Sequence, residues 1–170
     1  VLRGSINVGG EAVLNMDAQQ LRRYRGKTCA MIFQEPLLAF DPVYTVGQQI
    51  IEGLRRHEGL SRRDAKARAL EALRQVRIPS PERRLEAYPH EMSGGMRQRA
   101  MIALALSCNP QLLLADEPTT ALDATVQIQI LILLREQQKL RDLSIIFVTH
   151  DIGAAVEIAD RVAVMYAGRI

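Results

Sequence analysis

Residues 112–123 read "LLLADEPTTALD", a short apolar run followed by two adjacent carboxylates. A run of this length, bounded by polar or turn residues, is typical of a strand buried on both faces of a sheet. Runs of the same kind occupy residues 30–33, 145–148 and 162–165. Helical patterns lie between the runs, and strands that alternate with helices predict an α/β fold built on a parallel sheet.

The clearest helical patterns follow the second and third runs, at residues 124–141 and 151–159. The first 20 residues have a different character, with two short strand-like segments, "SINVGG" and "EAVLNM". A helix is expected after them, near residues 18–25. The chain has no internal repeat and no low-complexity segment.

Residues 42–106 carry only helical patterns, broken into turns by Pro79, Pro81 and Pro89. Val46, Ile50 and Leu54 are spaced by four and mark one apolar stripe of a helix. Ser61 stands where an N-cap is expected for the next helix, with an acid three residues later. The sequence therefore predicts a helical block inserted into an α/β domain.

The composition suits one globular domain, because 48% of the 170 residues are hydrophobic and 24% are charged. Aromatic residues make up 4% and Trp is absent, so stacking platforms for bases are scarce. The net charge of +3 does not require a nucleic-acid partner, and we expect none. Cys29 and Cys108 lie among apolar neighbours and are interpreted as reduced, buried thiols. We expect a cytosolic protein, since no signal peptide and no membrane-spanning run of roughly 20 apolar residues is present.

Polar side chains follow three of the four apolar runs. Gln34 follows the first run, Asp116 and Glu117 follow the second, and His150 follows the third. Ligands bind at the carboxyl edge of open parallel sheets. These four side chains are therefore expected to converge, although they are far apart in the sequence.

Each of these residue types has a chemistry that suits a phosphate site. Asp116 could hold Mg²⁺, and Glu117 could orient or deprotonate a water that attacks a phosphate. His150 could donate to a developing negative charge, and Gln34 could hold a water or the metal. Simpler interpretations exist for each: an Asp-Glu pair after a strand is often a turn with a helix cap, and a lone His is often structural.

Residues 90–100, "HEMSGGMRQRA", place Ser93, Gly94 and Gly95 directly before a helical stretch. Glycine lets the main chain approach another group closely. Backbone N–H groups at a helix start can receive an anion, and a phosphate is the obvious candidate.

The segments "MSGGM", "LLLADEP", "TTALD" and "VTHD", in this order, resemble the ATP-binding subunit of an ABC transporter over nearly the whole chain. The resemblance implies a partial P-loop NTPase (RecA-like) parallel sheet with an inserted α-helical subdomain. It places the incomplete α/β ATPase core at residues 1–41 and 107–170, and the helical signature subdomain at residues 42–106.

The resemblance also implies roles for particular residues. Glu117 and His150 match the catalytic positions, and Asp116, with Gln34, matches the Mg²⁺ ligands. The positions that contact ATP in the family are matched by Gln34, Ser93, Gly94, Gly95, Met96 and Asp123. In the family, two subunits pair head to tail, and the signature of one caps the γ-phosphate of the ATP that the other holds.

The function implied is an ATPase that energises an importer, bound peripherally to the inner face of the cell membrane. Its partners would be a second ATP-binding subunit, identical or related, the membrane permeases and, indirectly, an extracytoplasmic solute-binding protein. The segments "AMIFQEP", "DPVYTVGQQI" and "YPHEMSGGMRQR" are similar to the dipeptide, oligopeptide and nickel importer group. "ALSCNP" and "EIADRVAVMYAG" are most similar to its glutathione and dipeptide members.

The sequence departs from the family in one major respect, because no phosphate-binding loop G-x-x-x-x-G-K-[ST] is present. We therefore expect a fragment that binds ATP poorly and is inactive alone. Minor departures are Met92, Met96 and Thr120, which replace commoner residues.

Two other functions are compatible with the pattern. One is a soluble ABC-type ATPase of DNA repair or translation; the repair proteins insert long coiled coils between the positions of Gln34 and Ser93. That interval is short in this chain and has no sustained heptads, which argues against it. The other is a non-catalytic structural fragment, which the missing loop favours for the chain as given.

Overall fold

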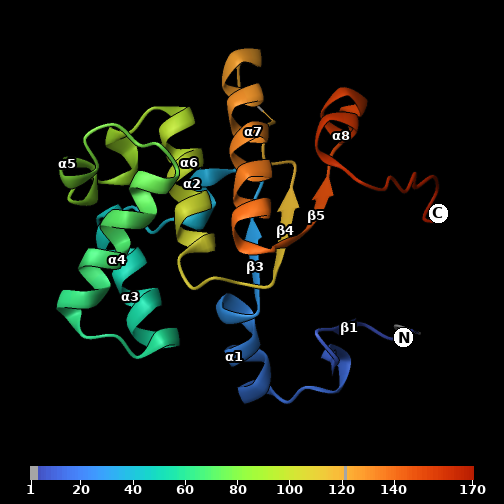
Figure 1. Ribbon diagram of the computed structural model, residues 1–170, viewed down its shortest axis with the longest axis horizontal. Coiled ribbons are helices and arrows are strands. Elements are labelled where there is room, and N and C mark those ends of the chain that lie inside the picture. Colours follow the sequence, from blue (N-terminus) through green and yellow to red (C-terminus); the bar gives the residue numbers. More distant parts are fainter. Residues whose placement is uncertain (1–3, 121) are drawn as a thin grey trace.

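The centre of the fold is a three-stranded parallel sheet in the order β3-β4-β5 (Figure 1). The computed structural model describes residues 4–120 and 122–170. The strands are β3 (Cys29–Ile32), β4 (Leu112–Asp116) and β5 (Ser144–Val148). Leu112 is the register partner of both Cys29 and Ser144, so the strands begin at the same level and their carboxyl ends meet at one edge. The α/β class, the parallel sheet and three of the four predicted strands are confirmed.

Helices α7 (Ala124–Arg141) and α8 (Ile152–Ile158) follow β4 and β5, as predicted. Asp123 caps the start of α7, where its carboxylate accepts a hydrogen bond from the Val126 amide at 3.0 Å. Figure 1 shows α7 lying across one face of the sheet, with α8 beside it. Leu113 of β4 belongs to the same buried cluster as Ile130 and Leu133 of α7, which anchors the helix on this face.

The opposite face of the sheet is open in the described part of the chain. Met31 of β3 and Ile146 of β5 are 39% and 53% exposed. Both flank Leu114 in register, whereas the alternate residues of the strands point into the core. The prediction that each strand is buried on both faces is therefore wrong for β3 and β5, because α6 and α7 pack on one side only.

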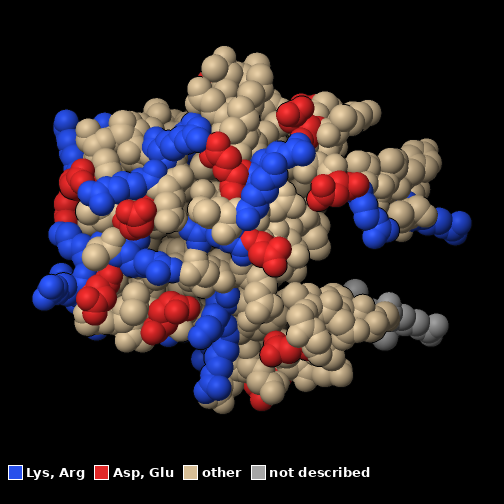
Figure 2. Space-filling model, viewed as in Figure 1, with Lys and Arg blue, Asp and Glu red and all other residues tan. Residues whose placement is uncertain are grey.

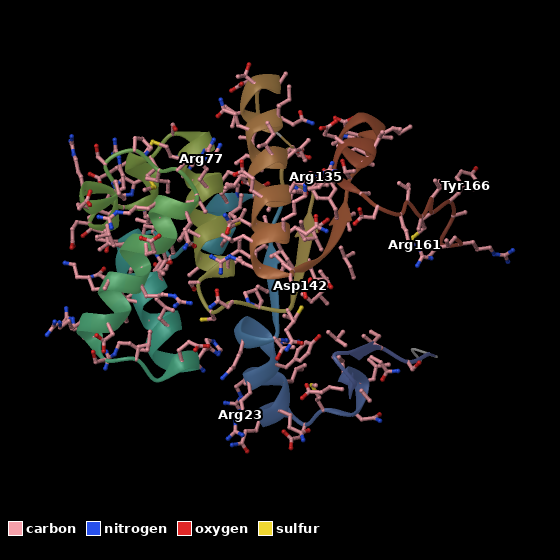
Figure 3. All side chains as sticks on the ribbon, in the orientation of Figure 1. Arg23, Arg77, Arg135, Asp142, Arg161 and Tyr166 are labelled. Atoms are coloured by element: carbon pink, nitrogen blue, oxygen red, sulfur yellow. The ribbon has the colours of Figure 1, made fainter. Side chains whose placement is uncertain are left out.

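The fourth apolar run, residues 162–165, was predicted as a strand, and this prediction is wrong. Val164 is 77% exposed, and the run forms no ladder with the described strands. Tyr166 and Arg169 exchange backbone hydrogen bonds of 2.8 and 3.0 Å in a local turn. Figure 3 shows Arg161 and Tyr166 on a segment that leaves the body of the protein. An apolar run becomes a strand only where an edge offers hydrogen bonds, and this segment does not reach the β5 edge.

The helical block lies to one side of the sheet (Figure 1). Val46, Ile50 and Leu54 are fully buried, so the predicted stripe is confirmed. Ser61 caps the second helix through the Asp64 amide at 3.2 Å, also as predicted. The division into core and helical subdomain stays a prediction. The elements of the block are α3 (Val46–Glu58), α4 (Arg62–Gln75), α5 (Pro81–Leu85), η2 (Pro89–Glu91) and α6 (Gly94–Leu106).

The N-terminal segment forms two short strands and then a helix, as predicted, and the structure shows that the strands pair as an antiparallel hairpin. The hairpin pairs Asn7 with Ala12. Asp17 begins the helix with a reciprocal cap, in which its carboxylate accepts from the Gln20 amide at 2.8 Å. The elements are β1 (Asn7–Val8), β2 (Glu11–Ala12), η1 (Val13–Asn15) and α1 (Ala18–Lys27), with α2 (Pro36–Ala39) following β3.

Basic and acidic side chains are interspersed over the helical block on the face drawn in Figure 2, so neither sign of charge dominates there. Among the residues that the structure describes, every helix is too short or too polar to span a bilayer.

Candidate active site at the carboxyl edge of the sheet

The three strand ends carry Gln34, Glu117 and His150 to one edge of the sheet. Glu117 directly follows β4, and the other two side chains stand two residues beyond the ends of β3 and β5. Because the strands are parallel and in level register, these side chains leave the sheet side by side. The predicted convergence of these three residues is confirmed by their hydrogen bonds.

The carboxylate of Glu117 is the centre of the cluster. The Gln34 amide donates to Oε2 at 3.1 Å, and the hydroxyl of Thr120 donates to the same oxygen at 2.9 Å. The Nδ1 atom of His150 lies 3.1 Å from the other oxygen, Oε1. Both oxygens of this carboxylate are therefore engaged, by groups that follow the other two strands and by the turn after β4.

The backbone at Glu117 has a conformation that non-glycine residues rarely adopt. Its φ is 45°, in the left-handed region. Its N–H continues the sheet by donating to the Val148 carbonyl at 3.0 Å, while its own carbonyl accepts from the Thr120 amide at 3.2 Å. Such a conformation costs about 1–3 kcal/mol and persists only where neighbouring contacts impose it. It turns the Glu117 side chain toward its partners and brings the Thr120 hydroxyl within reach.

The electrostatics of the cluster favour an ionised Glu117. The hydrogen bond from Thr120, and next that from His150, lower the pKa of the Glu117 carboxyl below its ordinary value. The side chain remains partly accessible, and that of His150 is 73% exposed. A carboxylate held by donors, yet open to solvent, can orient a water molecule or take its proton.

Asp116 is the last residue of β4, opposite Val148 in the register, and it is exposed. Asp116 ends β4, whereas Glu117 lies beyond the strand with a positive φ, and in the described residues the hydrogen bonds around the Glu117 carboxylate do not involve the Asp116 side chain. The convergence of Asp116 with the other three residues therefore stays a prediction. The described part of the chain holds no cluster of three or more His, Cys, Asp and Glu side chains suited to a metal. One carboxylate and the Gln34 carbonyl would suit Mg²⁺, which keeps its waters and uses few protein ligands beside substrate phosphates.

Ser93, Gly94 and Gly95 form the start of α6, as predicted. Ser93 caps the helix, its hydroxyl accepting from the Met96 amide at 3.3 Å. A Cβ on Gly95 would come 3.0 Å from Cγ1 of Val126 in α7, so packing inside the chain explains this glycine. A Cβ on Gly94 would meet no described atom within 4 Å. Packing against the described residues therefore does not require glycine at position 94.

The Asp123 side chain caps α7 and, among the described residues, makes no hydrogen bond to the Glu117 cluster. Met96 is half-buried against the core, and only its backbone N–H takes part in the cap. Thr120 was not predicted as a site residue. In the sequence it stands out only because it replaces the residue that is commoner at this position of the family. A hydroxyl three residues after a candidate catalytic carboxylate is the signal that points to it.

A hollow of about 490 Å³ lies elsewhere, between the hairpin and α1. Its lining includes Glu11, Tyr24, Lys27 and Arg23, which Figure 3 labels on α1. None of the residues around Glu117 lines it, so this hollow is separate from the cluster.

The family model described as "ABC transporter" matches residues 2–120. This chain belongs to the ABC transporter family. The match covers the start of the chain through the Glu117 turn, including Gln34 and the Ser93-Gly94-Gly95 stretch. The resemblance inferred from the four segments is thereby confirmed.

Curated relatives carry names from peptide transport. "Probable peptide ABC transporter ATP-binding protein y4tR" of Sinorhizobium fredii is 54% identical over 167 residues, which are 98% of this chain and 50% of that protein. "Oligopeptide transport ATP-binding protein OppD" of Bacillus subtilis is 53% identical over 168 residues, 99% of this chain and 47% of that protein. The chain thus spans about half the length of the curated relatives it matches.

The fold also matches a solved ABC cassette, MJ0796, determined as a dimer in a post-hydrolysis state bound to ADP and Pi. The TM-score is 0.79 at 29% identity, covering 91% of this chain and 66% of that one. The predicted P-loop NTPase architecture is therefore confirmed for the part of the fold that this ABC chain contains.

Proposed function

We propose that this chain is the catalytic-edge portion of an ATP-binding subunit that energises an importer of peptides or similar small solutes. The observation that carries the proposal is the convergence of Gln34, Glu117 and His150 at the carboxyl edge of the sheet. The names of the relatives support peptides as the solute class. They also favour an importer over a repair or translation ATPase. The short interval between Gln34 and Ser93 argues further against the repair proteins, which insert long coiled coils there.

In the proposed reaction, Glu117 aligns a water molecule for attack on the γ-phosphate of ATP and takes up its proton. Thr120 and Gln34 hold the carboxylate in place from one side. His150 is positioned to donate to the charge that develops on the phosphate oxygens. Asp116 and Gln34 would hold Mg²⁺, which when bound neutralises phosphate charge.

The second half of the site would come from another subunit. Ser93, Gly94 and Gly95 are exposed or half-buried at the start of α6 and would cap a phosphate held by a head-to-tail partner. Met96 and Asp123 would lie at the same boundary. The dimeric state of the related cassette supports this arrangement. Permeases and an extracytoplasmic solute-binding protein would complete the assembly on the inner face of the membrane.

The proposal is tested by ATP hydrolysis in two proteins, this 170-residue chain and a subunit extended upstream to include a G-x-x-x-x-G-K-[ST] loop. We expect hydrolysis from the extended subunit and negligible turnover from the chain alone, because the loop supplies the Lys and hydroxyl that hold the β- and γ-phosphates and Mg²⁺. An extended subunit that neither binds nor hydrolyses ATP would overturn the proposal. Ordinary turnover by the chain alone would overturn the claim that the loop is required.

A further inference from the structure

One hydrogen bond joins helix α7 to the loop that carries His150. The side-chain amide of Gln127, in the first turns of α7, donates to Oδ2 of Asp151 at 2.8 Å. Asp151 directly follows His150, and α7 begins after Asp123. The bond therefore connects two segments that both lead into the candidate site.

Asp151 uses each of its carboxylate oxygens for a different partner. Oδ1 caps α8 by accepting from the Ala154 amide at 3.2 Å, while Oδ2 accepts from Gln127. The backbone N–H of Asp151 donates to the hydroxyl of Thr149 at 3.0 Å. His150 is thus flanked on both sides by residues whose side chains fix the local backbone.

Few other contacts hold His150 in place. Its side chain is largely exposed, and its hydrogen bond to Glu117 is the one polar contact that the described residues give it. Helix α8 is short, and Ile152 and Val156 on its outer side are exposed, while Ala154 and Ile158 are buried. The position of the imidazole therefore depends on how firmly the loop and α8 are attached to the rest of the fold.

Helix α7 attaches this segment at two points. Gln127 holds its beginning through Asp151, and the Arg135 guanidinium donates to the carbonyl of Glu157 near the end of α8. Figure 3 shows Arg135 between the two helices. The pKa of the Asp151 carboxyl is lowered mainly by the hydrogen bond from Gln127. The hydrogen bond from the Ala154 N–H is the next largest cause. Of the two hydrogen bonds from α7, the one from Gln127 acts nearer to His150, because its acceptor Asp151 is the next residue.

We propose that Gln127 is a positioning residue of the site, which acts through Asp151 to hold the His150 loop beside Glu117. This inference rests on the proposed ATPase function for its catalytic consequence, but the tie itself can be tested without it. Because Gln127 lies one turn after Asp123, the same tie fixes the start of α7 relative to His150.

The first test measures hydrogen–deuterium exchange in the 170-residue chain. Gln127→Ala removes the tie, and Gln129→Ala is the matched control, since Gln129 lies on the same helix and accepts a hydrogen bond from Arg99 instead. We expect the amides at positions 151–155 to exchange about fivefold faster in Gln127→Ala, as befits loss of one hydrogen bond. They should be unchanged in Gln129→Ala. Equal exchange of this segment in both variants would overturn the tie.

The second test reverses the polarity of the bond. Gln127→Glu places two carboxylates together, whereas adding Asp151→Asn lets the new amide donate to the new carboxylate and still cap α8. We expect the single variant Gln127→Glu to exchange fastest in residues 149–155, and the double variant to return toward wild type. A double variant as mobile as Gln127→Glu would contradict a direct bond.

The third test is steady-state ATP hydrolysis by the extended subunit with its partner subunits. We expect Gln127→Ala to lower kcat about tenfold with KM for ATP unchanged, because a misplaced His150 affects the transition state rather than nucleotide binding. The double variant that combines Gln127→Glu with Asp151→Asn should restore kcat, and Gln129→Ala should leave it unaltered. If the wild type is active and Gln127→Ala has the same kcat, the positioning role is overturned. An inactive wild type overturns the proposed function instead, and the exchange measurements still judge the tie.

Discussion

The side-chain amide of Gln98 donates a hydrogen bond to the backbone carbonyl of Pro118, the residue directly after Glu117. Gln98 is 2% exposed and belongs to α6, whereas Pro118 begins the turn at the end of β4. The helix that starts at the Ser-Gly-Gly stretch is therefore tied directly to the turn that orients the candidate catalytic carboxylate.

Replacement of Gln98 by Ala is expected to lower the free energy of unfolding by about 1–3 kcal/mol, because the buried carbonyl of Pro118 loses its donor. Denaturant unfolding of the 170-residue chain measures the change. Gln19→Ala, at an exposed position of α1, is the control and should stay within about 0.5 kcal/mol of wild type. Equal stability of the two variants would show that the buried bond contributes nothing.

Gly47 is a position of the helical block where any larger side chain is expected to lower stability. A Cβ at this position would clash with the backbone carbonyl oxygen of Leu85, which cannot rotate away as a side chain could. Gly47→Ala should destabilise the chain by about 1–3 kcal/mol through overpacking. Gly53 lies in the same helix with no atom within 4 Å, so Gly53→Ala should stabilise it by about 0.5–1 kcal/mol. Thermal unfolding that ranks the two variants in the opposite order would contradict the close approach of α3 and α5.

The variant Gly94→Ala tests whether glycine at this position is required for stability or for ATP hydrolysis. Because a Cβ at Gly94 meets no described atom, the variant should unfold like wild type, whereas Gly95→Ala must displace Val126. In the extended subunit, Gly94→Ala should slow ATP hydrolysis about tenfold or more, since a methyl group would displace the phosphate that we propose lies against this backbone. Full activity of a stably folded Gly94→Ala subunit would mean that no phosphate comes close to this turn.

Cys108 is expected to resist alkylation while the chain is folded. Burial raises the pKa of its thiol above the ordinary value, so at about pH 8.5, where an ordinary thiol is half ionised, a smaller fraction of Cys108 is thiolate. The stabilisation that accompanies this raised pKa is complete below about pH 8.5 and is lost as the pH rises through the folded value. Iodoacetamide labelling, followed by mass spectrometry with Cys29→Ala to isolate the site, should be far slower in buffer than in urea. Equal labelling rates would refute the burial of Cys108.

Much of the sheet could be predicted from the sequence because its strands are short apolar runs. The runs at residues 30–33, 112–115 and 145–148 became strands, and polar residues after each one marked the carboxyl edge. The run at residues 162–165 has the same composition but no strand edge beside it in the described structure. The composition of a segment indicates whether it can form a strand. Whether it does so depends on another strand, distant in the sequence, that offers backbone hydrogen bonds.

The three converging residues of the candidate site could be predicted from the sequence, whereas the residues that hold them in place could not. Parallel topology alone brings Gln34, Glu117 and His150 together. Thr120 reaches Glu117 only because the backbone there adopts a positive φ, which no local pattern announces. The bond between Gln127 and Asp151 depends on how α7 crosses the sheet, so it too was invisible in the sequence.

The most direct measurement of the central claim is single-turnover ATP hydrolysis by the extended subunit, with its partners, comparing wild type with Glu117→Gln. The substitution keeps the shape of the side chain and removes its basicity, and Glu52→Gln on the exposed side of α3 is the control. We expect Glu117→Gln to bind ATP normally but to hydrolyse it about 10²–10⁴-fold more slowly, the range for loss of a general base. An unchanged hydrolysis rate in Glu117→Gln would contradict the claim that this edge of the sheet is where the phosphate is cleaved.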